Sequence, residues 1–370
     1  MSLKESRKKP FRPLFVPLAG ASLGILKMLN ANYQVDSKFR RKWILTKTVG
    51  AISSGFGYID RIIWHSVKPA ETADPLFIIG HWRSGTTLLH SAICETGDVS
   101  YTTTYQGVFP NNLLFAKWLF KSIMRILMPR ERPGDGIPLN PNFPQEEEIA
   151  LGNEVAYSYY YWFYFPRHTM EFAEKFLLGT AEKSEKERWS ANYKRFVKRC
   201  ERNRKGRFYV SKNPPNTFRI EELLRIYPKA KFVFIHRDPY EVFLSCRRFF
   251  WETVKGIQLQ EITQEEVDTN NLRVYKMMME RYMETRQVIP EGQLYELSYK
   301  ELIENPFSQI LKIVNHLNLG FNEKKLKRVS AYFDKHKDHV VKQYTPGPED
   351  VELVNLHWTP YLNELGYKMK

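Results

Sequence analysis

One stretch around residue 80 constrains the fold of this chain more than any other feature. Residues 75–79 (PLFII) form an unbroken apolar run, which is typical of a strand buried on both faces of a parallel sheet. A glycine-containing loop, residues 80–87 (GHWRSGTT), follows directly, and the pattern of residues 87–93 predicts a helix. Glycines in such a loop let backbone N–H groups approach an anion, and the start of the helix adds partial positive charge. The stretch therefore predicts an anion-binding loop between a strand and a helix.

Short apolar runs followed by helical patterns recur later in the chain. The runs are residues 207–211 (RFYVS), 231–235 (KFVFI) and 293–297 (QLYEL), and the helices are expected at about 216–227, after Asp238 and from about Lys300. Asp238 is a good helix N-cap because a proline and, two residues later, a glutamate follow it. Strands that alternate with helices predict a three-layer α/β/α fold around a central parallel sheet. Ligands of such a fold bind at the carboxyl ends of the strands.

The first 70 residues have a different character and predict a helical N-terminal extension. Residues 36–68 carry apolar positions at helical spacing. The apolar stretch before them, residues 13–26, is too short to span a membrane and is interrupted by a proline and two glycines. We expect an extension over residues 1–70 and a catalytic domain over residues 71–370. Packing on the core, dimerisation and contact with a membrane surface remain alternative roles for the extension.

The composition excludes several classes of protein. A hydrophobic fraction of 43% with 14% aromatic residues excludes disordered and fibrous chains. The three cysteines lie far apart in the sequence, which excludes a disulfide scaffold and a CxxC metal or redox site. A net charge of +15 favours an anionic partner, but by itself it does not distinguish nucleic acid, membrane or a phosphate-rich small molecule.

The cation of the anion-binding loop is displaced from the position that nucleotide kinases use. The spacing from Gly80 to Gly85 matches a P-loop, but Thr86 stands where a nucleotide kinase or NTPase has lysine. The loop carries Arg83 instead, and no carboxylate in a Walker-B setting follows the predicted strands. A sulfuryl group carries less charge than a γ-phosphate, so one cation and several hydroxyl donors suffice for it without a metal ion. The loop therefore favours sulfuryl over phosphoryl chemistry.

Three segments resemble the family of sulfotransferases that use 3'-phosphoadenosine 5'-phosphosulfate (PAPS), in particular its bacterial-type members. Residues 80–90 (GHWRSGTTLLH) resemble the loop that binds the 5'-phosphosulfate. Residues 231–245 (KFVFIHRDPYEVFLS) resemble the segment that binds the 3'-phosphate. Residues 297–306 (LSYKELIENP) resemble the segment near the adenine, with Lys300 where an acidic residue is usual. The first 70 residues lie outside this resemblance.

The resemblance implies roles for individual residues. Arg83 would stabilise charge on the bridging and sulfuryl oxygens as the S–O bond breaks, and Lys212, at the end of a predicted strand, would contact the same oxygens. The residues expected to bind PAPS are Arg83, Ser84, Gly85, Thr86, Thr87, Arg237, Ser245 and Tyr299. No metal ion is expected.

The predicted site offers several candidates for the general base. Many cytosolic relatives carry a histidine two residues after the lysine, but this chain has Pro214 there. Related bacterial-type members use a glutamate, so Glu146 and then Glu147, in the segment PQEEEIAL, are the candidate bases. Acidic residues in the first turn of a helix also have a purely structural explanation. His81 and His90 are reserve candidates.

Two aromatic segments are candidates for the acceptor site. Residues 157–165 contain eight aromatic residues among nine, which predicts either an apolar acceptor pocket or core packing. Residues 105–128 would form a lid over the same pocket or part of the core. The acceptor would be a small molecule, a lipid or a glycan that offers a hydroxyl or an amine.

The sequence therefore predicts a cytoplasmic PAPS-dependent sulfotransferase, with the inner membrane surface as a second location and a homodimer left open. No nucleic-acid partner is expected. Two alternatives remain at this stage: a P-loop nucleotide kinase or NTPase, and a non-catalytic basic protein that binds nucleic acid or a membrane.

Overall fold

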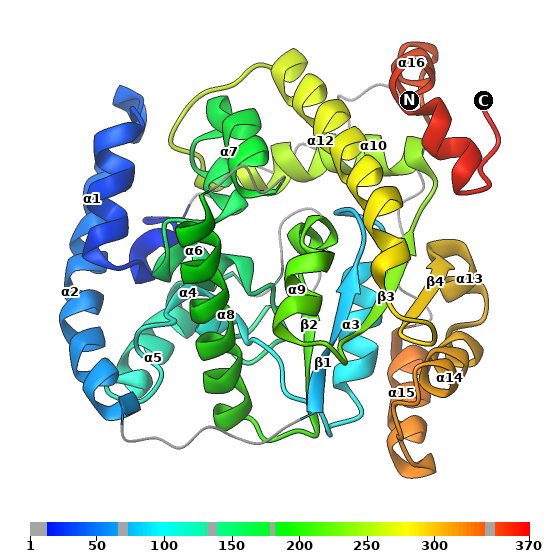
Figure 1. Cartoon of the computed structure of the whole chain (residues 1–370). Coiled ribbons are helices and arrows are strands. Elements are labelled where there is room, and N and C mark those ends of the chain that lie inside the picture. The colour runs from blue at the N-terminus through cyan, green and yellow to red at the C-terminus, as the bar shows by residue number, and fades with distance from the viewer. Residues whose placement is uncertain (1–12, 66–72, 130, 132–138, 178–181, 337–344) are drawn as a thin grey trace.

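A central sheet of parallel strands organises the molecule (Figure 1). The computed structural model describes residues 13–65, 73–129, 131, 139–177, 182–336 and 345–370. The strands are β1 (Ala73–Ile79), β2 (Phe208–Lys212), β3 (Lys231–His236) and β4 (Leu294–Ser298), in the order β2-β1-β3-β4. All three neighbouring pairs are parallel. The four predicted strands and their parallel arrangement are confirmed.

The described helices surround this sheet and also form the N-terminal region. They are α1 (Leu23–Asn32), α2 (Arg40–His65), α3 (Thr86–Cys94), α4 (Thr104–Val108), α5 (Lys117–Leu127), α6 (Glu148–Glu154), α7 (Thr169–Phe176), α8 (Lys183–Asn203), α9 (Ile220–Ile226), α10 (Pro239–Phe249), α11 (Lys255–Ile257), α12 (Gln264–Thr285), α13 (Tyr299–Glu304), α14 (Pro306–His316), α15 (Glu323–His336) and α16 (Pro348–Glu364).

The sheet has one apolar cluster on each face, because successive side chains of a strand point to opposite sides. Phe77 and Ile79 of β1 belong to the cluster beneath α8, α9, α10 and α12, whereas Leu76 and Ile78 belong to the cluster beneath α3, α13, α14 and α15. All four side chains are buried. This arrangement confirms the predicted α/β/α layers and explains why the strands are apolar without a polar alternation.

Local capping determines where the helices near the sheet begin. The Asp238 carboxylate accepts hydrogen bonds from the N–H groups of Tyr240 and Glu241, at 2.8 and 3.4 Å, as the sequence predicts for an N-cap. Helix α9 begins later than predicted, since Pro214 and Pro215 start a 3₁₀ turn, η5 (Pro214–Phe218), instead. These short connections keep the side chains that follow β2 and β3 at the carboxyl edge of the sheet.

Residues 13–65 pack against the rest of the molecule. Val16, Ile25 and Trp43 are buried in the same apolar cluster as α8 and α12. The Asn153 side-chain amide, on α6, donates to the Pro17 carbonyl at 3.1 Å, and the Asn153 carbonyl accepts from the Ser22 N–H at 3.0 Å. The boundary predicted at residue 70 lies outside the described residues and stays a prediction.

A helix with the length and apolar character needed to cross a membrane does not occur in the described part of the chain. The cytoplasmic location and the homodimer stay predictions.

Candidate active site

The loop after β1 is held tightly against the edge of the sheet. Gly80, Arg83 and Gly85 have positive φ angles of 135°, 69° and 96°. A Cβ atom on Gly80 would lie 2.2 Å from the Ile235 carbonyl oxygen, and one on Gly85 would lie 2.3 Å from the Tyr299 ring. Only glycine satisfies both the angle and the space at these two positions. Arg83 adopts the left-handed region with a full side chain, and such backbone strain is concentrated at functional sites.

The structure brings the loop together with the residues predicted to bind the 3'-phosphate. The Arg83 Nε atom donates to the Ser245 Oγ at 3.0 Å, and an Arg237 guanidinium nitrogen donates to the Arg83 carbonyl at 3.4 Å. The Arg237 guanidinium also lies 4.8 Å from the centre of the Tyr299 ring and forms an ion pair with Glu241. Residues from the loop after β1, from the connection between β3 and α10, from α10 and from α13 thus converge on one site that contains two guanidinium groups.

The hydroxyl residues of the loop lie at the start of α3. Ser84 and Thr86 are buried, with 1% and 4% of their surface exposed, and Thr87 is half-buried. Thr86 and Thr87 open the helix, so their N–H groups are among those without a partner inside the helix. The end of α3 that faces the loop therefore presents hydrogen-bond donors to an anion.

A chain of polar contacts connects the loop with Lys212 and Glu146. The Trp82 Nε1 donates to the Tyr160 hydroxyl at 2.9 Å. That hydroxyl donates to one carboxylate oxygen of Glu146, and the other oxygen forms an ion pair with the buried Lys212 ammonium group at the end of β2. Glu146 retains 15% side-chain exposure. The Glu146 carboxylate is partly accessible, lies beside a cation and is connected to the anion loop through Tyr160, so it is well placed to accept a proton.

The next two glutamates have different surroundings. Glu147 is fully buried and accepts hydrogen bonds from the Tyr193 hydroxyl at 2.8 Å, from the Asn216 amide at 3.1 Å and from the Ser211 hydroxyl. Burial raises the pKa of the Glu147 carboxyl above its usual value. The structure therefore places Glu147 in a buried network and leaves Glu146 beside Lys212.

Glu148 is held in a buried ion pair. Burial opposes ionisation, but the Arg219 guanidinium, which donates to both carboxylate oxygens at 2.7 and 2.9 Å, lowers the pKa of Glu148 below its usual value. Glu148 also accepts from the Asn213 amide at 3.0 Å. This pair anchors the start of α6 to the segment after β2 and so fixes the position of Glu146, two residues earlier.

The two reserve histidines are buried, His81 within the loop itself and His90 in α3. Burial lowers the pKa of His81 to about 4, and burial together with the charge of Lys212 lowers the pKa of His90 to about 3. The His81 Nδ1 contacts the Trp82 carbonyl at 2.9 Å. Both imidazoles are therefore neutral at pH 7. As candidate bases they stay predictions, with less access to the site than Glu146.

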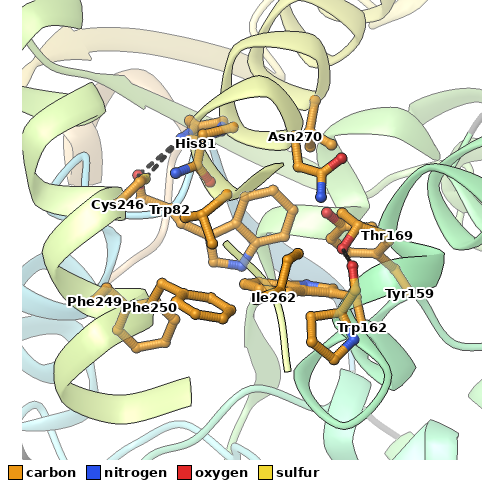
Figure 2. Close-up of a pocket in the computed structure, with 14 residues that line it drawn as sticks. His81, Trp82, Tyr159, Trp162, Thr169, Cys246, Phe249, Phe250, Ile262 and Asn270 are labelled. Carbon is orange, nitrogen blue, oxygen red and sulfur yellow. Dashed lines mark hydrogen bonds between the residues drawn. The ribbon is translucent and has the colours of Figure 1, made fainter. Parts of the chain in front are cut away.

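An aromatic pocket adjoins the loop at His81 and Trp82. Figure 2 shows the Trp82 indole between Phe249 and Phe250 on one side and Tyr159 and Trp162 on the other. Its remaining lining residues are His81, Pro166, Thr169, Cys246, Ile262, Val267, Asn270, Asn271 and Val274. The predicted aromatic run is thus divided, because Tyr159 and Trp162 line the pocket whereas the Tyr160 hydroxyl contacts Glu146.

Residues 105–128 do not line this pocket. Tyr105, Phe109, Phe120 and Met124 form a separate small core with Phe56 of α2. The lid alternative is therefore not supported for this pocket, and these residues belong to the packing between α2, α4 and α5.

Several site contacts are not evident from the sequence. Nothing in the aromatic run distinguishes Tyr160 from its neighbours, and the Trp82–Tyr160–Glu146 contacts join three distant positions. The ion pair of Arg237 with Glu241 is local, since Arg237 directly precedes the N-cap of α10 and Glu241 lies in the first turn of that helix. No cluster of three or more metal-ligating side chains occurs among the described residues.

A parallel sheet with a cationic, glycine-containing loop at its carboxyl edge defines an α/β protein with an anion-binding site. A sequence profile of the sulfotransferase family matches residues 75–323, and the chain belongs to this family. The chain is therefore an enzyme that transfers a sulfuryl group, as the sequence predicts. This membership sets aside the nucleotide kinase and the non-catalytic binding protein.

Relatives of known activity and structure agree with this assignment. The chain is 31% identical over 327 residues to the omega-hydroxy-beta-dihydromenaquinone-9 sulfotransferase Stf3 of Mycobacterium tuberculosis, covering 88% of this chain and 84% of that protein. The crystal structure of sulfotransferase STF9 from Mycobacterium avium matches with a TM-score of 0.70 at 16% identity, over 95% of this chain and 98% of that one. Sulfotransferase STF1 from M. tuberculosis matches with a TM-score of 0.62 at 16% identity, over 84% and 85%. At these identities the two structures show a shared fold.

Proposed function

We propose that this sulfotransferase uses PAPS as its donor and sulfates a hydroxyl group of an apolar, lipid-like acceptor. The observation that carries the donor assignment is the contact of the Arg83 guanidinium with Ser245 and of Arg237 with the Arg83 carbonyl. These contacts join the loop and the start of α10 into one site with two cations. A ligand with an anionic group at each of two ends, such as PAPS, matches this site.

The donor is oriented by residues from three elements. Ser84, Thr86 and Thr87 receive the 5'-phosphosulfate at the start of α3. Arg237 and Ser245 bind the 3'-phosphate, for which Arg237 exchanges its ion pair with Glu241. The Tyr299 ring, which packs on Gly85, lies beside the adenine.

The reaction is an in-line displacement at sulfur. The acceptor oxygen forms a bond to sulfur while the bond between sulfur and the phosphate oxygen breaks, and the electron pair of that bond stays on the phosphate oxygen. Arg83 and Lys212 stabilise the negative charge that develops there. Glu146 takes the proton of the acceptor hydroxyl. The Tyr160 hydroxyl holds the carboxylate in position through the oxygen that does not contact Lys212.

The pocket beside Trp82 favours an apolar acceptor over a glycan. Aromatic and aliphatic side chains make up most of its lining. Stf3, whose name gives an omega-hydroxy dihydromenaquinone as its substrate, supports the same class of acceptor. We therefore expect purified enzyme with labelled donor to sulfate long-chain and prenyl alcohols and to leave free sugars unmodified. Efficient sulfation of sugars with no product from the alcohols contradicts the acceptor class.

Arg237→Ala is expected to weaken the binding of adenosine 3',5'-bisphosphate by about 10- to 150-fold, the range for a lost charged hydrogen bond. Titration calorimetry on the folded variant measures the change. Arg273→Ala provides the control, because Arg273 is an exposed arginine on α12 that pairs with Glu174 at 4.0 Å. Equal affinity in the wild type and in Arg237→Ala removes Arg237 from the donor site.

A further inference from the structure

Helix α2 turns several polar side chains inward. Thr46, Ser53 and Asp60 are at most 2% exposed, although they are polar. The backbone of neighbouring segments satisfies them: the Ser53 hydroxyl donates to the Ala19 carbonyl at 3.0 Å, and Asp60 accepts from the N–H groups of residues 113, 114 and 115. Gly50 and Gly57 lie close to Leu26 and Asn111, and the buried Trp43 packs into the apolar core, so α2 lies against the rest of the molecule.

The outer side of α2 is correspondingly apolar. Its exposed positions recur at helical spacing, and the large apolar side chains among them are 38% to 64% exposed: Ile44, Leu45, Ile52, Tyr58, Ile59, Ile62 and Ile63. A globular surface helix normally shows the opposite distribution, with polar residues outside. The apolar outer side of α2 therefore points to a binding surface.

The apolar surface continues from α2 onto α5. Residues 113–115, which precede α5, are fixed to α2 through Asp60, and the Phe56 and Phe115 rings stack at 6.0 Å. Figure 1 shows α5 beside the end of α2 at one edge of the molecule. The exposed apolar side chains of this part are Leu114, Phe115, Trp118, Ile126 and Leu127, with Trp118 at 74% and Ile126 at 80% exposure. We call these residues, with those of the outer side of α2, the α2–α5 face.

The charged side chains that α2 and α5 carry are cations, with one exception. Helix α2 carries Arg40, Arg41, Lys42, Lys47 and Arg61, and α5 carries Lys117, Lys121 and Arg125. The single acidic residue of the two helices is Asp60, whose carboxylate is buried against backbone amides. Burial and the neighbouring Arg125 lower the pKa of Lys121, as expected where cations crowd together. The partner of the face is thus apolar and anionic.

We propose that the α2–α5 face binds the surface of an anionic lipid bilayer. Amphipathic helices with apolar and basic residues lie in the interface of such membranes, where acyl chains take up the apolar side chains and headgroups pair with the cations. Two copies of the chain joined through this face by a two-fold axis would instead bring cations together. The proposal concerns a surface outside the donor site and does not depend on which acceptor the enzyme uses.

Co-sedimentation with vesicles tests the proposal without donor or acceptor. We expect the wild type to bind vesicles of equimolar phosphatidylcholine and phosphatidylglycerol, and to bind phosphatidylcholine alone much more weakly. The double variant K121Q/R125Q should bind the anionic vesicles about 30-fold more weakly, since each cation near such a surface contributes about 1 kcal/mol. The variant I62S/W118S should bind the anionic vesicles at least about tenfold more weakly than the wild type, because two apolar side chains no longer insert among the acyl chains.

Matched variants on other helices provide the controls. Leu356→Ser removes an apolar side chain of α16 that is 75% exposed, and K324Q/K327Q removes two cations of α15. Both should bind anionic vesicles like the wild type, and far-ultraviolet circular dichroism confirms that every variant is folded. Wild-type binding by K121Q/R125Q and I62S/W118S overturns the proposal. If the wild type sediments as a dimer and both variants sediment as monomers, the face mediates self-association and the proposal is overturned.

Discussion

Glu146→Gln is expected to lower kcat by about 10²- to 10⁴-fold, the range for the loss of a general base. Glutamine keeps the size of the side chain and still contacts Lys212 and the Tyr160 hydroxyl, but it takes up no proton. Binding of adenosine 3',5'-bisphosphate should therefore change little, because the donor residues are untouched. Single-turnover kinetics with labelled donor separate the chemical step from binding and product release.

Two further variants distinguish a base from a merely structural carboxylate. Tyr160→Phe keeps the ring but removes the hydroxyl that positions the carboxylate, so it should lower kcat less than Glu146→Gln does. If Glu146→Gln retains kcat within about twofold while Glu147→Gln loses it, the base is Glu147.

Arg83→Ala is expected to lower kcat by about 10²- to 10³-fold, as for the loss of a preorganised donor to a developing oxyanion. The Arg83 guanidinium donates to the Ser245 hydroxyl at 3.0 Å, and in the proposed reaction it stabilises the phosphate oxygen that leaves sulfur. An effect on kcat distinguishes Arg83 from Arg237, whose replacement should act mainly through the affinity for the donor.

The positive φ angle of Arg83 requires a second variant as a control for backbone strain. With φ at 69°, alanine retains the strain of the left-handed region, whereas glycine relieves it. Equal losses in Arg83→Ala and Arg83→Gly assign the effect to the missing guanidinium. Steady-state rates of both variants, at saturating donor, provide the comparison. A kcat for Arg83→Ala within about twofold of the wild type contradicts the role proposed for this residue.

Most of the sheet and the anion loop could be predicted from local patterns. Residues 75–79 and 231–235 are apolar runs in the sequence and lie in the centre of the sheet, in β1 and β3. Asp238 was expected to cap a helix, and its carboxylate does so. Such features depend on residues a few positions apart, and so they are present in the sequence itself.

Contacts between distant residues could not be predicted in this way. Three consecutive glutamates look equivalent in the sequence, but Glu146 pairs with Lys212, Glu147 joins a buried network and Glu148 pairs with Arg219. The separation arises because the start of α6 packs against the end of β2, which lies more than 60 positions later in the chain. The strand order β2-β1-β3-β4 likewise depends on which distant segments pack together, and local patterns do not specify it.

The amino-acid sequence by itself determined the α/β fold class, the four strands and the loop with Arg83, because periodicity, capping and glycine positions act over a few residues. The sulfotransferase class followed from the resemblance of three segments to that family. Only the tertiary structure decided which glutamate lies beside Lys212, that Tyr160 connects Trp82 with that glutamate, and that α2 turns its apolar side outward. These features depend on which surfaces meet when helices and strands pack, and a buried polar group must find its partner there wherever that partner lies in the chain.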